Sequence, residues 1–134
     1  MRQDIIISIR REYSVKIYSG EKLYDLRKRK PSIPIGTICW IYEPAPVCLI
    51  TGYFIYCGCA KENKVQFYFY HKCSIGVSAK EFFDYYEGEY YAHALIIESP
   101  KKLVNPISLK EISVKRAPQS YMYIDGELLD KHKK

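Results

Sequence analysis

The hydrophobic residues of this sequence fall in short runs rich in isoleucine, valine and aromatic residues, separated by glycine, proline and charged residues. Runs of this length and composition are typical of β-strands. Such short strands cannot each shield an apolar face alone, so we expect them to close around a shared core. The pattern predicts one curled, mixed sheet made of residues 4–10, 23–28, 37–43, 47–56 and 92–98.

Two segments, 12–19 and 78–87, have the features of short helices. Gly20 follows the first, and glycine suits the left-handed position that ends a helix. The second opens with Ser78 and has a glutamate three residues later, which is the spacing of a capping box. We expect the aromatic stripe at 82–86 to pack in the core rather than to form a base-stacking surface.

The remaining chain gives weaker signals. Residues 60–73 suit a strand by their aromatic content or a helix by their polar start. Gly52 lies inside an apolar run, which indicates a bulge or sharp bend. We expect short strands at 106–109 and 121–124, and a charged, frayed tail over 125–134.

Length and the 48% of hydrophobic residues indicate one globular domain spanning residues 1–134, and the strands scattered around two or three helices indicate the α+β class. The 21 Lys and Arg against 15 Asp and Glu give a net charge of +6, which is compatible with nucleic acid. The cysteine count of five is odd, no secretory signal is recognisable and no apolar run approaches the ~20 residues of a membrane span. We therefore expect a cytoplasmic, monomeric protein with free thiols, no membrane partner and no cofactor.

A zinc site is one alternative to free thiols, because Cys57-x-Cys59 and His71-x-Cys73 supply nitrogen and sulfur ligands. If the region is a hairpin turning at 61–64, the two pairs lie roughly 17 Å apart at ~3.4 Å per residue. If it is a helix, neither pair shares a face. Both geometries disfavour a metal, so none is expected. His93 falls in a buried-strand pattern, which indicates a hydrogen-bonded wall residue.

The predicted strand at 23–28 leads into a basic run closed by proline. Because side chains alternate along a strand, Asp25, Arg27 and Arg29 share one face, and Tyr24 and Leu26 share the other. This pattern predicts an amphipathic strand with a charged outer row. Taken by itself, the row is a solvated basic edge that protects against aggregation.

The spacing Gly20-x-Lys22-x-x-Asp25-x-Arg27 resembles the Gly-x-Lys-x-x-Glu-x-Arg signature of the ASCH domain family, a branch of the PUA-like superfamily. The surrounding order is similar too, and the resemblance spans residues 5 to about 124. Its other parts are the Ile-Ser-Ile strand, the helix at 12–19, the strand through Thr51-Gly52-Tyr53, the helix from Ser78 to Gly88, the strand from Ala92 to Glu98, and Pro118-Gln119-Ser120.

The resemblance implies a small mixed or antiparallel β-barrel with two to three flanking helices and a cleft lined by the motif. It also implies a role with RNA. Some similar domains bind RNA, one branch cleaves it, and another removes acetyl from acetylcytidine with a lysine, a threonine and a glutamate. Asp25 stands where the family usually has glutamate. It also occupies the place of that threonine, so this chain lacks the hydroxyl nucleophile of the amidohydrolase branch.

The chemistry of the motif and the basic run fits RNA or a nucleotide-like ligand. Lys22 can hold a phosphate as a point charge, and Arg27 can hold one through two hydrogen bonds or stack on a base. Tyr24 can stack an unpaired base, and Lys28 and Arg29 add positive charge. RNA binding in a basic cleft is accordingly the first hypothesis.

An RNA-directed hydrolase, either a ribonuclease or a modified-nucleoside amidohydrolase, is the second hypothesis. Its catalytic groups would be Lys22, Asp25 and Ser120. Lys22 can act as a base only if its pKa is lowered: burial beside Arg27 would lower it, and a tight pair with Asp25 would raise it. Asp25 can instead be a structural ion-pair partner that only orients the strand. A protein-interaction module of a transcriptional coactivator-like regulator is the third hypothesis.

Overall fold

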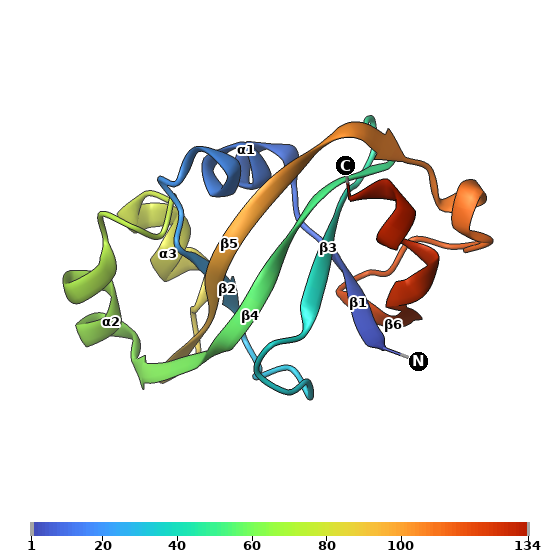
Figure 1. Ribbon diagram of the computed structural model, residues 1–134. Coiled ribbons are helices and arrows are strands. Elements are labelled where there is room, and N and C mark those ends of the chain that lie inside the picture. The colour runs from blue at the N-terminus through green and yellow to red at the C-terminus, as the bar shows by residue number, and fades with distance from the viewer. Residues whose placement is uncertain (1, 134) are drawn as a thin grey trace.

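The computed structural model describes residues 2–133, and within them the strands form one six-stranded sheet (Figure 1). Their order is β2-β5-β4-β3-β1-β6. β1 pairs with β3 in parallel and all other neighbours pair antiparallel, so the predicted mixed sheet is confirmed. The strands are β1 (Gln3–Ser8), β2 (Tyr24–Arg27), β3 (Ile38–Glu43), β4 (Leu49–Asn63), β5 (Tyr91–Ile107) and β6 (Tyr121–Asp125).

The strand order leaves β2 and β6 at the two edges of an open sheet. Since no backbone ladder joins these edges in residues 2–133, the closed barrel expected from the resemblance is not confirmed. The sheet nevertheless curls enough for Arg27 on β2 to reach the far side. Its Nη2 donates to the Ser8 carbonyl at 3.0 Å, and its Nη1 donates to Ser120 Oγ at 3.3 Å. A side chain therefore bridges the seam between the edges.

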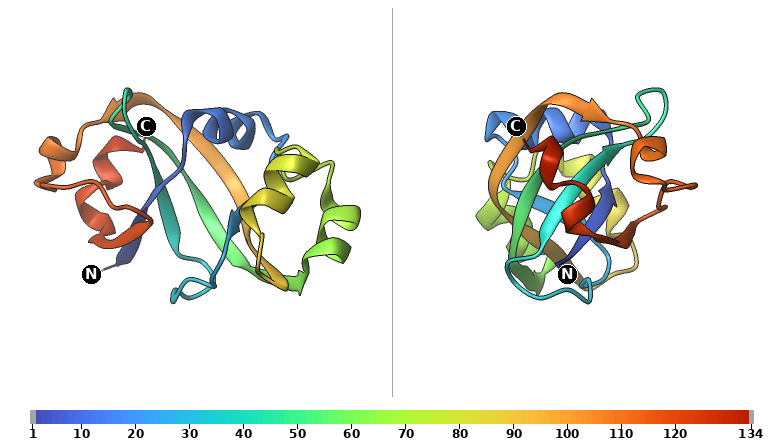
Figure 2. Two further views of the ribbon diagram at one scale, coloured as in Figure 1. Left: turned by 180° about the vertical axis from the view of Figure 1, so that it is seen from behind. Right: turned by 45° about the vertical axis from the view of Figure 1, so that its right-hand side comes forward.

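Three α-helices flank the sheet: α1 (Arg11–Ser19), α2 (Lys64–His71) and α3 (Ala79–Tyr85). Figure 1 shows α2 and α3 together at one end of the molecule, with the C-terminal segment at the other, and the reverse view in Figure 2 shows the same separation. Short 3-10 helices follow β5 and β6 at Leu109–Ile112, Gly126–Leu128 and Asp130–His132.

The predicted helix ends are confirmed. Gly20 takes a φ of 88° after α1, and its N–H donates to the carbonyl of Ile17. Ser78 caps α3 by accepting from the N–H of Glu81, whose carboxylate accepts from the N–H of Ser78, so the capping box is complete. Both ends therefore follow from the local sequence.

The ambiguous segment 60–73 contains both structures that the sequence permitted. β4 continues to Asn63, and α2 starts at the next residue. Asn63 Oδ1 accepts from the N–H groups of Val65 and Gln66 at 2.9 and 3.3 Å, so this side chain marks the change from strand to helix.

Two strands run past their predicted ends. β4 is 15 residues long and shifts register beside Gly52, where the bulge was expected. β5 is 17 residues long and continues through Pro100 and Pro106. β2 pairs only with the 93–96 part of β5, so beyond it one edge of β5 is unpaired. A proline can lie there without removing a ladder hydrogen bond, which explains why the strand does not stop at residue 98.

The sheet carries a core on each face. The inner core lies under α1 and includes Ile5, Ile7, Ile41, Phe54 and Leu95. The opposite face is divided between a cluster beside the C-terminal segment, which includes Ile6, Trp40 and Ile107, and a cluster beside α2 and α3, which includes Phe67, Phe82 and Tyr86. Alternate residues of β1 thus enter different cores, as strand geometry requires.

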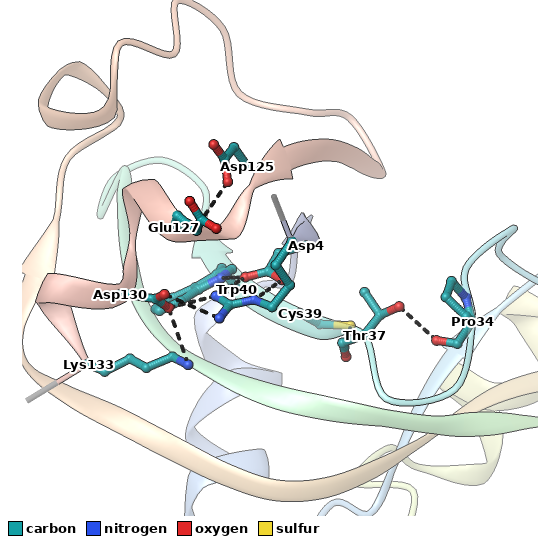
Figure 3. A network of polar contacts seen from close by, with 10 residues as sticks. Asp4, Pro34, Thr37, Cys39, Trp40, Asp125, Glu127, Asp130 and Lys133 are labelled. Carbon is teal, nitrogen blue, oxygen red and sulfur yellow. Dashed lines mark hydrogen bonds and ion pairs between the residues drawn. The ribbon is translucent and has the colours of Figure 1, made fainter.

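The segment after β6, expected to fray, lies against the body of the protein up to residue 133. Leu129 is fully buried, and Arg2 donates to Asp4 at 2.8 Å and to Asp130 at 2.6 Å (Figure 3). Trp40 Nε1 also donates to the buried Asp4 at 2.9 Å. The burial of Leu129 and this ion-pair network thus hold the segment against the sheet although it is rich in charged residues. Its last residue, 134, lies outside the described residues.

Candidate functional site

Asp25 and Arg27, two residues of the predicted charged row, face inward, which corrects the expectation of a solvated outer row for them. Arg29 lies past the end of β2 and is exposed. Asp25 is 5% exposed, and Arg27 is largely buried at the seam of the sheet. Tyr24 and Leu26 pack toward α2 and α3 on the opposite face. Those helices bring a large aromatic cluster to that side of β2, so the apolar residues turn to it and the charges turn to the inner face. The ring of Tyr24 lies 5.5 Å from that of Phe67.

Lys22 is the most deeply buried lysine of the motif region. Its exposure is 2%, and its Nζ donates to the carbonyl of Ile75 at 2.5 Å and lies 5.3 Å from the ring of Tyr13. Burial lowers the pKa of Lys22 to about 8, and the positive charge of Arg27 acts in the same direction, while Asp25 opposes the shift. The lowered pKa increases the neutral fraction of this amine near physiological pH, although the protonated form still predominates below pH 8.

Asp25 is paired with Arg27. The distance from Arg27 Nε to Asp25 Oδ2 is 2.6 Å, and the arginine also holds Ser8 and Ser120 across the seam. Asp25 thus orients the arginine. Its charge raises the pKa of Lys22, but the larger effect of burial lowers it. Three of the five N–H donors of the guanidinium are used in these bonds, which leaves two for a ligand.

A groove runs along β2 as three adjoining hollows that share the ring of Tyr85. We call it the β2 groove. The first hollow, of about 100 Å³, contains Lys22; the next, of about 240 Å³, contains Asp25 and Arg27; the last, of about 450 Å³, lies beyond Arg27. The groove is lined by Tyr13, Lys22, Asp25, Arg27, Lys28, Arg29, Tyr85, Ser120 and Tyr121, among others.

The β2 groove brings together most of the residues named from sequence. Arg27 is bonded to Ser120, and Lys28 and Arg29 line the widest hollow. Lys28 Nζ lies 5.1 Å from the ring of Tyr85, a cation–π distance. The structure does not bring Tyr24 into the groove, since its ring lies on the α2 side of the sheet.

The sequence did not indicate the three tyrosines that line the groove, Tyr13, Tyr85 and Tyr121. Phe82 in α3 and Tyr86, which caps its C-terminal end, take the buried face, so Tyr85 is turned by roughly 100° from Tyr86. Tyr85 is 39% exposed and lines all three hollows. This helical offset is the signal that separates it from the core stripe, in which it was placed from sequence.

The histidines and cysteines considered from sequence contribute no recognisable metal centre. Within residues 2–133, no group of three or more His, Cys, Asp or Glu side chains is arranged to hold a metal ion. Cys57 and Cys59 form no disulfide, and His71 lies against Tyr24 and Phe67. His93 was expected to be hydrogen-bonded, but its Nδ1 is buried without a hydrogen-bond partner.

None of the helices between residues 2 and 133 combines the length and the apolar character needed to cross a bilayer. The longest helix, α1, has nine residues.

Comparison with known proteins gives a consistent result, although no family model matches the sequence. A curated protein of Zymomonas mobilis subsp. mobilis, the ASCH domain-containing ribonuclease, is 28% identical over 130 residues, which cover 94% of this chain and 87% of that protein. Crystal structures of ZmASCH from Zymomonas mobilis are also similar. The crystal structure of ASCH from this organism has a TM-score of 0.86 and 26% identity, and the match covers 96% of this chain and 92% of that chain.

A tyrosine-to-phenylalanine mutant of ZmASCH has the same TM-score of 0.86, with 25% identity over 97% of this chain and 96% of that chain. Sequence and fold thus agree over nearly the full length of both chains, and they agree with the resemblance drawn from the motif. In sequence and in fold, the chain therefore resembles proteins of the ASCH domain family.

Proposed function

We propose that this protein binds single-stranded RNA in the β2 groove and cleaves its phosphodiester backbone there, with Lys22 as general base. The observation that carries the proposal is a buried lysine of lowered pKa in the same groove as the positively charged Arg27. The relative that matches 94% of this chain is named a ribonuclease, which supports RNA as the substrate class.

The proposed reaction is internal attack by a ribose 2′-hydroxyl on the adjacent phosphorus. Neutral Lys22 takes the proton of the 2′-hydroxyl, the bond from phosphorus to the 5′-oxygen breaks, and the leaving oxygen takes a proton from solvent. The products are a cyclic 2′,3′-phosphate and a 5′-hydroxyl. Arg27 stabilises the charge that develops on the phosphate oxygens, and Asp25 and Ser120 hold the guanidinium in place.

The dimensions of the groove match this division of roles. The hollow at Lys22, about 100 Å³, is smaller than the ~150 Å³ cavity that holds a benzene ring, so it suits a hydroxyl or phosphate group better than a base. The hollow beyond Arg27, about 450 Å³, can hold a base, and Tyr121 and Tyr85 line it as aromatic partners.

The positive charge along the groove supports RNA over an acetylated nucleoside as substrate. Lys28 and Arg29 follow Arg27 directly, line the widest hollow and can contact phosphates outside the reacting one. Asp25, in the place of a threonine nucleophile, is held by Arg27, which gives the amidohydrolase hypothesis no attacking group.

The test is turnover of RNA oligonucleotides by Lys22→Ala and by a matched control, Lys64→Ala. Lys64 also donates to a main-chain carbonyl, that of Tyr86 at 2.9 Å, but it lies at α2 outside the groove. We expect Lys22→Ala to lose turnover and Lys64→Ala to keep it. Products are identified by mass, because internal attack leaves a cyclic phosphate.

Binding is measured in parallel with Lys28→Ala and Arg29→Ala, which remove charges of the groove without disturbing the seam. Each should lower affinity and reduce the dependence of log affinity on log salt concentration by about 0.7 for a single strand. Turnover that survives Lys22→Ala rejects the general base. Salt-dependent binding with no product leaves the RNA-binding hypothesis, and absence of both favours the protein-interaction hypothesis.

A further inference from the structure

The inner face of the sheet continues past the β2 groove as a row of polar side chains across three strands. Arg27 on β2 pairs with His93 on β5, and His93 pairs with Lys61 on β4. Side chains at directly paired positions lie on the same face of a sheet. The backbone positions of Arg27 and Lys61 are thus two strand spacings of ~4.8 Å apart, about 10 Å in total.

The row ends in an exposed aromatic ring. Tyr91 is 43% exposed and lies two residues before His93 on β5, so it faces the same side. Lys61 is exposed, and its Nζ lies 4.5 Å from the centroid of the Tyr91 ring. A lysine that rests on a ring can turn to a phosphate and leave the ring face to a base, since its stem is flexible.

His93, at the centre of the row, has an unused hydrogen-bonding atom. Its Nδ1 is buried and has no partner in residues 2–133. Burial lowers the pKa of His93, and the positive charges of Lys61 and Arg29 add to this effect, while Glu89 opposes it. Because Nδ1 is itself buried, the support for a ligand here comes from the two cations around His93, an arrangement suited to an anionic ligand.

We propose that single-stranded RNA leaves the β2 groove at Arg27, crosses β5 at His93, and ends in a second subsite where Tyr91 stacks a base and Lys61 binds a phosphate. This inference rests on the proposed function and specifies its substrate as a strand of several nucleotides. The row is continuous with the groove on one face, has net positive charge, and ends in a ring of the kind that single strands stack on.

The experiment compares a 2′-O-methyl dinucleotide with 2′-O-methyl oligonucleotides of about 4 to about 16 nucleotides, the site sizes typical of single-strand-binding folds. The methyl group blocks the attacking hydroxyl, so only affinity is measured. Tyr91→Ala should weaken the longer probes at least about fivefold and leave the dinucleotide unchanged. Tyr91→Phe keeps the ring and should bind like the parent.

For the longer probes, Lys61→Ala should reduce the slope of log affinity against log salt concentration by about 0.7. For the dinucleotide, the slope should stay unchanged. Tyr70→Ala and Lys110→Ala are matched controls, since Tyr70 is 78% exposed on α2 and Lys110 is exposed in the 3-10 helix after β5. Circular dichroism confirms that each variant is folded.

The inference is overturned if Tyr91→Ala and Lys61→Ala bind all lengths as the parent does. If Lys28→Ala and Arg29→Ala still weaken binding in that case, the β2 groove remains the site and only the extension fails. If the parent itself binds none of the probes, the inference and the proposed function fail together.

Discussion

The buried amine of Lys22 makes a measurable prediction about stability. The side chain of Lys22 packs closely against Gly76: a Cβ added at Gly76 would lie only 3.1 Å from Lys22 Cδ. Lys22→Met keeps an unbranched stem, so this packing is largely preserved. The variant loses a charge that is 2% exposed and a hydrogen bond to the carbonyl of Ile75. The substitution should therefore separate the cost of burying the charge from the packing of the side chain.

The magnitude follows from the pKa of Lys22, which burial lowers from 10.5 to about 8. Below pH 8 the amine is charged in both states, and the folded protein bears the cost of the buried charge. Between pH 8 and 10.5 only the unfolded chain holds the proton, so the parent's free energy of unfolding rises by about 1.4 kcal/mol per pH unit, about 3 kcal/mol in all. This gain is absent in the variant.

At pH 7 the variant should accordingly be the more stable protein by roughly 2 kcal/mol, after allowing ~1 kcal/mol for the lost hydrogen bond. Above pH 10.5 the order should reverse. The assay is urea unfolding of both proteins under reducing conditions between pH 7 and 10.5, with Lys64→Met as control. Subtracting the free energy of unfolding of one protein from that of the other at each pH removes the contribution of all other titrating groups. A difference that stays constant over this range would refute the lowered pKa, and with it the case for Lys22 as a base.

Three further predictions concern neighbouring features. Asp25→Asn removes the carboxylate that opposes the shift, so the pKa of Lys22 should fall further and the rising limb of a pH–rate profile should move to lower pH; an unchanged limb would mean that Asp25 does not influence Lys22. Gly52→Ala would put Cβ within 2.5 Å of the Tyr18 hydroxyl, so a loss of more than about 1 kcal/mol is expected in urea unfolding. Glu43 is 2% exposed and accepts from two hydroxyls, so Glu43→Ala should cost about 2 kcal/mol, and a thermal midpoint equal to that of the parent would contradict this.

Much of the fold was predictable because its determinants are local. The short β-branched runs specified strands, and Gly20 and Ser78 specified helix ends that the structure confirms. The side to which β2 turns its charges was not predictable, because alternation identifies the residues that share a face and does not identify the side on which the core lies. That choice depends on α2 and α3, which pack against Tyr24 and Leu26.

The candidate site was predictable to a similar extent. The motif supplied Lys22, Asp25 and Arg27, which do lie in one groove. Tyr85 was missed because the whole aromatic stripe at 82–86 was assigned to the core, although its helical offset from Tyr86 turns it outward. The row ending at Tyr91 was also out of reach, since it depends on the register between three strands that are distant in the sequence.

The Arg27 bridge between β2 and the far edge of the sheet has a mechanical consequence. Elsewhere the width of the sheet is fixed by backbone ladders, whereas at this seam it is held by side chains: Arg27 is hydrogen-bonded to Ser8 and Ser120, and Ser32 is hydrogen-bonded to two tyrosines of β6. Release of these contacts can widen the groove without breaking any strand pair, so opening there requires less free energy than opening between paired strands. The scaffold is therefore most compliant along the line where a polymer would enter and leave, and it can admit a strand sideways instead of threading it from one end.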